Sequence, residues 1–388
     1  MKKALLTAAA LLLATISFSQ PQILPGAESV DEYLPMLQGK RVSLLSNQTG
    51  ILLSGRHVLD TLISSGVNVV SILSPEHGFR GDADAGEYVN NSVDEATGVP
   101  IRSLYNSNKG VPSDEMVEEF DVLIFDLQDV GCRFYTNNVI MGKVMGVCAA
   151  HGKKVIILDR PNPIGFLVDG PILDMQFKSD VGWYPIPVCH GMTLGELALM
   201  INGEGWLPGG IKCDLTVIKC RNYTHASRYT LPVKPSPNIP DIRSVYLYPS
   251  MCYFEATPVS LGRGTDKAFQ MYGHPNMKGY DFSFTPRSVP GAKRPPQLDK
   301  ECYGVDLRTE PSDEEIIEAG INLEYVIDAY RNLNLDDHYF RPFFEKLIGR
   351  DYVRKMIKTG ASAAEIKACW AEDVEAFKVQ RAPYLLYE

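Results

Sequence analysis

Four short apolar runs in the first half of the chain constrain its fold more than any other feature. Each is rich in β-branched residues and apolar on both faces, as are strands of a parallel sheet covered by helices. Helix-like segments separate the runs, so strands and helices alternate. We therefore expect an α/β fold with a Rossmann-like, mostly parallel sheet. The runs are Arg41–Ser46, Val69–Ser74, Val122–Phe125 and Val155–Leu158, and Leu215–Ile218 is a further strand.

The helices of this half are predicted from their apolar spacing and their caps. Thr193 and Glu196 have the spacing of a capping box at the start of a helix that runs to Gly203. The other predicted helices are Val30–Gln38, His57–Ser65, Ser113–Glu119 and Asn138–His151.

The second half has a different character, which predicts a smaller mixed α+β domain. Pro232–Ser250 is rich in proline and is expected to be an extended connection. We place a Rossmann-like domain at 20–230 and an α+β domain, which closes a cleft, at 231–388. The predicted strands are Met251–Glu255, Tyr280–Pro286 and Tyr303–Leu307, and the predicted helices are Ser312–Asn332 and Ala361–Gln380.

The first 19 residues have the pattern of a secretory signal peptide. Lys2 and Lys3 precede an apolar stretch from Ala4 to Ala14, and small residues stand at Ser17 and Ser19. We expect the mature protein to be exported to the periplasm or secreted. No other run has the ~18 apolar residues of a membrane span.

Charge and motifs narrow the function. The formal net charge is -9, and no Lys/Arg-rich run is present, so no nucleic-acid partner is expected. Dinucleotide, P-loop and nucleophile-elbow motifs are missing, and no strong set of metal ligands is visible, so neither cofactor nor metal is expected. The eight cysteines are expected to be mostly buried thiols, with at most one disulfide.

Dense polar clusters follow the four apolar runs. Parallel strands of one sheet present their carboxyl ends at one edge, where open α/β sheets bind ligands. The clusters should therefore meet and form a site. They contain Asn47 after the first run; Glu76, His77 and Arg80 after the second; Asp126, Asp129, Arg133 and Tyr135 after the third; and Asp159, Arg160 and Asn162 after the fourth.

Carboxylates in pairs suit the cleavage of a glycosidic bond, because one acts as acid and the other as base or nucleophile. Glu76 directly follows an apolar run, where burial would raise the pKa of its carboxyl, so it is the candidate acid. Its partner is one of Asp126, Asp129 and Glu255. Segments 234–240 and 255–265 of the second half are expected to close over the cleft, with Glu255 and Arg263 facing the strand ends.

Several of these stretches resemble the exo-acting β-N-acetylmuramidases of the NamZ family. They are SNQTGI, SPEHGFRGDADAG, DVLIFDLQDVGCRFYT, LDRPNPIG, HGMTLGELA, PSPNIP, FEATPVSLGRGT and RAPYLLY, and they cover nearly the whole mature chain. The resemblance implies a Rossmann-like domain, a smaller second domain and a cleft between them. It also implies release of N-acetylmuramic acid from the non-reducing end of peptidoglycan fragments, with Glu76 as the catalytic carboxylate.

The predicted site combines both lines of argument. Its catalytic residues are Glu76, Asp126 and Asp129, and its substrate-binding residues are Asn47, His77, Arg80, Arg133, Tyr135, Arg160, Asn162, His190, Glu255 and Arg263. N-acetylmuramic acid carries a lactyl carboxylate, which an arginine would bind bidentately. Arg80, Arg133, Arg160 and Arg263 are all candidates. The alternatives are a non-catalytic periplasmic binder of cell-wall sugars and a metal-dependent deacetylase or amidase.

Overall fold

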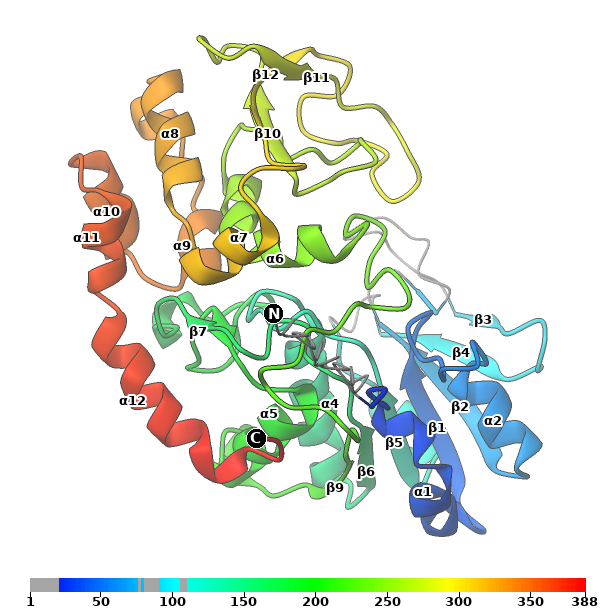
Figure 1. Ribbon diagram of the computed structural model, residues 1–388. Helices are drawn as coiled ribbons and strands as arrows, with labels where there is room; N and C mark the ends of the chain where they lie inside the picture. The colour runs from blue at the N-terminus through cyan, green and yellow to red at the C-terminus, as the bar shows by residue number, and fades with distance from the viewer. Residues whose placement is uncertain (1–20, 76–77, 80–90, 105–109) are drawn as a thin grey trace, which may run out of the picture.

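The computed structural model describes residues 21–75, 78–79, 91–104 and 110–388. In the described part of the chain, a seven-stranded sheet forms the base of the molecule, with the order β3-β4-β2-β1-β5-β6-β9 (Figure 1). Every neighbouring pair is parallel except β3 and β4. Its strands are β1 (Arg41–Ser46), β2 (Asn68–Ser74), β3 (Ser92–Val93), β4 (Pro100–Ser103), β5 (Val122–Asp126), β6 (Lys154–Leu158) and β9 (Asp214–Ile218).

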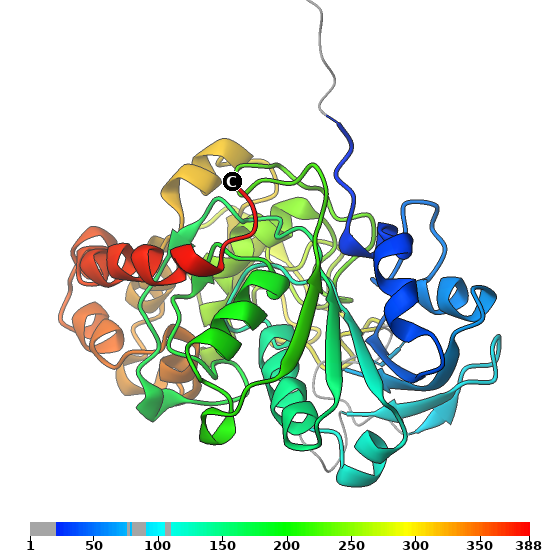
Figure 2. The ribbon, with the colours of Figure 1, turned by 90° about the horizontal axis from the view of Figure 1, so that it is seen from below.

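Helices cover both faces of this sheet, as the two-sided apolar runs predict (Figure 2). Alternate residues of each strand enter different cores: Leu44 and Ile124 pack on one face, and Leu45 and Phe125 on the other. The first face holds α1 (Val30–Leu37) and α2 (Val58–Ser64); the second holds α3 (Asp114–Glu118), α4 (Asn137–Ala150) and α5 (Leu194–Gly203). The α/β expectation is therefore confirmed, and Thr193 and Glu196 form the predicted capping box.

The second half builds a smaller unit of helices and a three-stranded antiparallel sheet, order β10-β12-β11 (Figure 1). Its strands are β10 (Met271–His274), β11 (Phe282–Phe284) and β12 (Cys302–Asp306). Its helices are α6 (Ile242–Met251), α7 (Asp313–Ala319), α8 (Glu324–Leu333), α9 (Phe343–Ile348), α10 (Tyr352–Lys358), α11 (Ala363–Ala368) and α12 (Ala371–Arg381). A third core joins Val130 and Phe134, beyond β5, to Phe254 and Phe344 of this unit.

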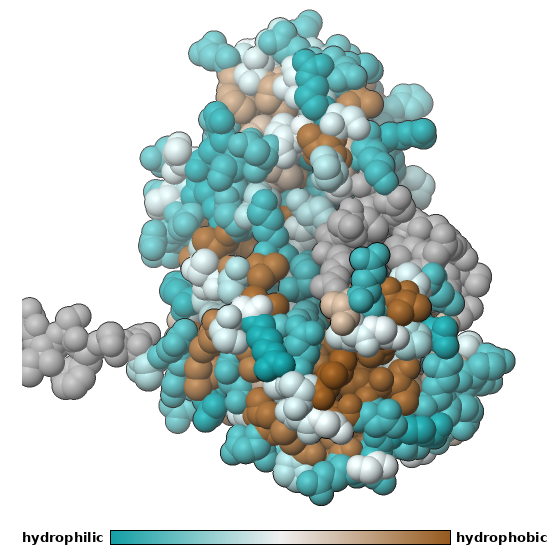
Figure 3. Space-filling view, turned by 90° about the vertical axis from the view of Figure 1, so that its right-hand side faces the viewer, coloured by the Kyte–Doolittle hydropathy of each residue, from teal (hydrophilic) through white to brown (hydrophobic). Residues whose placement is uncertain are grey.

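Short elements complete the described chain. Strands β7 (Val168–Asp169) and β8 (Cys189–His190) pair with each other. The 3-10 helices are η1 (Gly26–Glu28), η2 (Met175–Phe177), η3 (Pro208–Gly210), η4 (Cys252–Ala256), η5 (Asp336–His338) and η6 (Ala382–Tyr384). Hydrophobic side chains gather on the lower half of the face in Figure 3, over the parallel-sheet part of the molecule.

Four predictions about the second half are wrong. Residues 242–250 are not extended: they belong to α6, which Asp241 caps by accepting from Ser244 N, and Pro249 lies within this helix. Met251–Glu255 is not a strand, because the chain continues from α6 into η4. The residues of Met251–Glu255 are nearly all buried, so the sequence has no alternation of polar and apolar residues here that would distinguish a helix from a strand.

The other two errors concern helix length. Ser312–Asn332 holds two helices, α7 and α8, because Gly320 (φ 63°) turns the chain after Ala319. Ala361–Gln380 likewise divides into α11 and α12. All eight cysteines are free, and only Cys369 is exposed. No helix in the described ranges has the length and apolar character of a bilayer span.

Candidate active site

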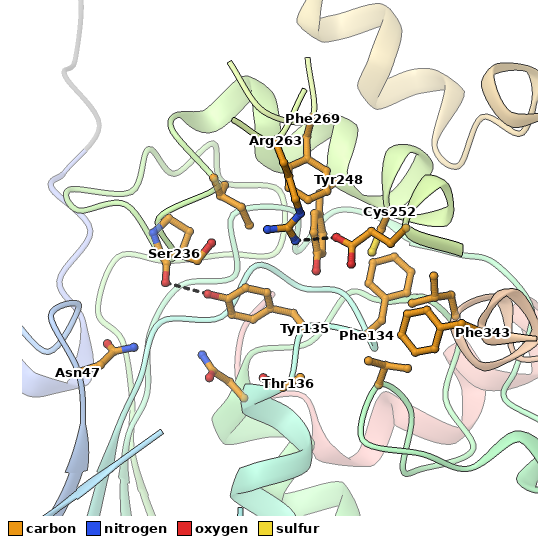
Figure 4. A pocket seen from close by; sticks show the side chains of 16 residues that line it. Asn47, Phe134, Tyr135, Thr136, Ser236, Tyr248, Cys252, Arg263, Phe269 and Phe343 are labelled. Carbon is orange, nitrogen blue, oxygen red and sulfur yellow. Dashed lines mark hydrogen bonds and ion pairs between the residues drawn. The ribbon is translucent and has the colours of Figure 1, made fainter. Parts of the chain in front are cut away.

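A pocket lies where the carboxyl-end edge of the parallel sheet meets the second half of the chain (Figure 4). The first half contributes the segment after β1 and the turn into α4. The second half contributes segment 235–239, α6, η4, α9 and the loop before β10. The lining residues are Asn47, Phe134, Tyr135, Thr136, Asn137, Val181, Pro235, Ser236, Ile239, Tyr248, Cys252, Glu255, Arg263, Phe269, Phe343 and Leu347.

Local hydrogen bonds fix the part of the pocket that comes from the first half. The Asn47 side chain accepts from the backbone N–H of Thr49 at 3.0 Å and from its hydroxyl at 2.6 Å, which forms the turn after β1. Asn138 Nδ2 donates to the Tyr135 carbonyl at 2.6 Å at the start of α4. These bonds place Asn47 and Tyr135 at the carboxyl-end edge of the sheet.

Two side chains of the first half hold the proline-rich segment across this edge. Tyr135 Oη donates to the Pro235 carbonyl at 2.9 Å, and Gln48 Nε2 donates to the Lys234 carbonyl at 3.1 Å. The segment that the sequence predicted to close the cleft therefore bonds directly to the strand-end loops. Ser236 and Ile239 from this segment line the pocket.

The opposite wall carries an ion pair. Arg263 Nη2 donates to Glu255 Oε1 at 2.6 Å, and the Arg263 guanidinium carbon lies 5.3 Å from the centre of the Phe269 ring (Figure 4). Burial alone would lower the pKa of Arg263, but the charge and hydrogen bond of Glu255 outweigh it and raise this pKa. The guanidinium therefore stays charged in a partly dry setting.

Four of the predicted site residues thus line one pocket, although they lie far apart in the sequence. Asn47 and Tyr135 come from the sheet edge, and Glu255 and Arg263 from the second half. A charged pair, a tyrosine and an amide among aromatic side chains are the mixture typical of small-molecule sites. Sugars suit such a lining because they present apolar faces and many hydroxyl groups.

Asp126 and Arg160 are bound to each other behind the sheet edge. Arg160 Nε lies 2.6 Å from Asp126 Oδ1, and Nη2 lies 3.0 Å from Oδ2. Arg160 Nη2 also donates to the Ile51 carbonyl at 3.1 Å. Both side chains are buried, so the pair joins the loops after β1, β5 and β6.

Asp129 is buried in the loop after β5 and has an unusual environment. Its Oδ1 accepts from the Gly131 N–H at 2.7 Å, whereas Oδ2 has no partner among the described residues. Burial raises the pKa of this carboxyl to about 7, despite the lowering effect of the backbone hydrogen bonds. A carboxyl of this kind is able to hold a proton near neutral pH.

Arg133 points away from the pocket and into the protein. Its Nη1 donates to the carbonyls of Pro171 and Ile186, each at 2.8 Å, and its Nη2 donates to the Leu347 carbonyl at 2.9 Å. The side chain is completely buried, and burial lowers its pKa to about 10. In this position it connects the first half of the chain to α9.

The side chains of Asn162 and His190 form hydrogen bonds with nearby backbone groups. Asn162 accepts from Ile164 N at 2.9 Å and donates to the Met192 carbonyl at 2.8 Å. His190 Nδ1 accepts from Met192 N at 3.2 Å, and its Nε2 is without a partner in the described part of the chain. Burial, followed by the charges of Arg381 and Arg133, lowers the pKa of His190 to about 3.

Glu76, His77 and Arg80 lie outside the described residues. Strand β2 ends at Ser74, so these three follow the carboxyl end of a sheet strand in the sequence. The roles predicted for all the site residues stay predictions.

The sequence did not single out several lining residues, notably Tyr248, Cys252 and Phe343. Tyr248 and Cys252 lie at the end of α6 and the start of η4, where an extended segment and a strand were predicted. A helical assignment would have placed Tyr248, Cys252 and Glu255 near one another along the chain. In the described ranges, no group of three or more His, Cys, Asp or Glu residues could hold a metal ion.

Comparisons with known proteins agree with this architecture. The family models for the N-terminal and C-terminal parts of the exo-β-N-acetylmuramidase NamZ match residues 42–243 and 246–387. The peptidoglycan β-N-acetylmuramidase NamZ of Bacillus subtilis (strain 168) is 36% identical over 389 aligned positions, which cover 95% of this chain and 92% of that protein.

Two solved structures of DUF1343 family proteins from Bacteroides fragilis NCTC 9343 are similar as well. One is 58% identical with a TM-score of 0.89 and covers 95% of this chain and 99% of its own. The other is 29% identical with a TM-score of 0.79 and covers 95% and 100%. Because the two family models together span nearly the whole described chain, this protein belongs to the NamZ family of exo-β-N-acetylmuramidases, which are glycoside hydrolases.

Proposed function

We propose that this protein hydrolyses the β-glycosidic bond of N-acetylmuramic acid at the non-reducing end of peptidoglycan fragments. The observation that carries the proposal is the pocket in which Asn47 and Tyr135, at the sheet edge, share a lining with the Glu255–Arg263 pair. The Bacillus subtilis relative is named for this class of reaction.

In the proposed reaction, Glu76 is the general acid that gives its proton to the leaving glycosidic oxygen. A second carboxylate near the anomeric carbon either takes a proton from the water that attacks this carbon or forms a glycosyl-enzyme bond that water then cleaves. Glu255 suits this role because it lines the pocket and bonds to Arg263 through Oε1, which leaves Oε2 for the sugar. Asp126 suits it less, because Arg160 holds both of its oxygens.

The test uses aryl β-glycosides of N-acetylmuramic acid and N-acetylglucosamine, with the Glu76→Gln variant. Glu95→Gln is the matched control, because Glu95 lies exposed in a turn of the same region. We expect release from the muramide, a loss of about 10²–10⁴-fold in Glu76→Gln, and unchanged turnover in the control. Near-normal turnover by a folded Glu76→Gln variant would remove Glu76 from the mechanism. No release by the folded wild-type protein would favour a binding protein for cell-wall sugars.

We also propose that the chain is exported, from the signal-like pattern of its first 19 residues. The mature protein isolated from its native cell should begin at Gln20, which N-terminal sequencing would establish. An intact Met1 or the presence of the protein with cytoplasmic markers would contradict export.

A further inference from the structure

Arg263 has hydrogen-bonding capacity that the fold does not use. An arginine carries five N–H donors, and within the described residues Arg263 donates one bond, from Nη2 to Glu255. Its Nε and Nη1 groups have no protein acceptor there. Its side chain is 19% exposed and lines the pocket, so these donors are available to a bound molecule.

The other described arginines among the predicted ligands differ from Arg263 in this respect. Arg160 is engaged with both oxygens of Asp126, and Arg133 donates to three backbone carbonyls and is fully buried. Neither lines the pocket, whereas Arg263 does. Of these three arginines, Arg263 is therefore the one whose partners leave it able to bind a carboxylate of the substrate.

The surroundings of Arg263 hold it ready for an anion. The Glu255 bond and the Phe269 ring fix the plane of the guanidinium before any ligand arrives, so little side-chain entropy remains to be lost. Its partly buried position strengthens a charge-assisted bond, and the planar fork matches a carboxylate with two parallel N–H···O bonds. A neutral hydroxyl group would use only part of this geometry.

We propose that Arg263 is the residue that recognises the lactyl carboxylate of N-acetylmuramic acid. Glu255 positions the Arg263 guanidinium through Oε1, in addition to the role proposed for its Oε2 at the anomeric carbon. This inference rests on the proposed function. It identifies the group by which the pocket selects an acidic sugar over N-acetylglucosamine, which lacks the lactyl ether. Nη2 carries two hydrogens, of which one remains on Glu255. The carboxylate binds the edge of the guanidinium where the other Nη2 hydrogen lies parallel to the N–H of a neighbouring nitrogen.

The kinetic test compares wild type, Arg263→Gln and Arg263→Lys on the two aryl glycosides. We expect Arg263→Gln to lower kcat/KM for the muramide by about 10–100-fold, the loss typical of one charged hydrogen-bonding contact. Residual turnover of the glucosaminide should change less than about 3-fold. The kcat/KM of Arg263→Lys for the muramide should lie between those of wild type and Arg263→Gln, because an ammonium keeps the charge but not the planar fork.

Lys267→Gln is the matched control. Lys267 is a nearby cation paired with Asp241 at 2.8 Å, and it does not line the pocket. Its loss should leave the preference for the acidic sugar unchanged. Equal losses on both glycosides in Arg263→Gln would overturn the inference, because they would indicate a merely structural role.

A binding measurement separates this inference from the proposed function. Calorimetry with free N-acetylmuramic acid and free N-acetylglucosamine requires no turnover. If no glycoside is cleaved but the acidic sugar still binds more tightly and Arg263→Gln removes that difference, the reaction is wrong and the recognition stands. If wild type shows no preference for the acidic sugar in either measurement, Arg263 does not have this role.

Discussion

Arg160 binds both carboxylate oxygens of Asp126, through Nε to Oδ1 at 2.6 Å and Nη2 to Oδ2 at 3.0 Å, and both side chains are buried. The pair joins the loops that follow neighbouring strands β5 and β6. Asp126 was predicted to be catalytic. Because Arg160 engages both of its oxygens, we expect Asp126 to hold the strand-end loops together instead, and mutation separates these two roles.

Breaking this pair should destabilise the fold strongly. Asp126→Asn or Arg160→Met leaves one buried charge without its partner, which typically costs about 3–5 kcal/mol. The double variant should lose less than the sum of the two single variants, because it leaves neither charge behind. Urea unfolding in a double-mutant cycle measures the difference. Additive losses, or a fully folded Asp126→Asn without activity, would contradict the supporting role.

The stability of the protein should depend on pH through Asp129. Its carboxyl has a pKa of about 7 when folded and 3.8 as the ordinary value. Between these pH values the folded state holds a proton that the unfolded chain has released. Rising pH therefore removes stability across this window, by up to about 4 kcal/mol. Asp129→Asn has no carboxyl to titrate. The melting temperature of this variant, measured relative to that of wild type, should therefore increase as pH rises from 4 to 8.

Asp121→Asn provides a comparison of opposite sign. Bonds from Arg41 lower the pKa of Asp121 to about 2, so its contribution to stability is present at neutral pH and is lost only below about pH 4. The melting temperature of this variant should lie below that of wild type by a constant amount from pH 5 to 8. A flat difference for Asp129→Asn over the same range would refute the raised pKa.

Arg133 should stabilise the fold through the hydrogen bonds that it donates to buried carbonyls. Arg133→Met removes the donors of three buried carbonyls in separate segments, including Leu347 of α9. The Ile186 carbonyl keeps the Leu173 N–H at 3.1 Å, so the carbonyls of Pro171 and Leu347 are the ones left without a partner among the described residues. The cost should be at least about 2 kcal/mol, because each acceptor left without a partner costs about 1 kcal/mol or more. Arg308→Met, which breaks an exposed pair with Asp306, should change stability by about 0.5 kcal/mol or less. Similar melting temperatures for the two variants would contradict this prediction.

Tyr387 should contribute more to stability than a neighbouring tyrosine. Its hydroxyl donates to Asp159 Oδ2 at 2.6 Å and accepts from Cys220 N at 2.9 Å. Tyr387→Phe should therefore cost about 1–3 kcal/mol. Tyr384→Phe removes a bond to Glu204 Oε1 at the surface and should cost less than about 1 kcal/mol. Thermal unfolding of both variants tests the ranking, and a larger loss for Tyr384→Phe would reverse it.

The sequence predicted the parallel sheet because its signal is local. Leu44 and Leu45 face different cores, and a run that is apolar at both positions is enough to indicate a strand covered on both sides. The helix at 242–251 was not predictable in the same way. Pro249 within it and the prolines that precede it favour an extended chain, whereas packing of Val245 and Leu247 in the core between the two halves supports a helix.

The site was predicted in part for a similar reason. Asn47 and Tyr135 follow sheet strands, so the strand-end rule placed them correctly at one edge. The sequence could not tell Arg263 from Arg160 or Arg133 as the ligand of a carboxylate, because local sequence does not show which acceptors an arginine meets. Their difference lies in which distant acceptors each one meets, and that depends on tertiary structure.

The bond between Tyr387 and Asp159 joins residues 228 positions apart. Contacts over such separations form late, because the long loop between them must close first. The polar end of β6 therefore stays incomplete until the segment after α12 docks on it. A first half that folded early would therefore be an intermediate whose sheet edge lacks this bond, rather than a finished domain.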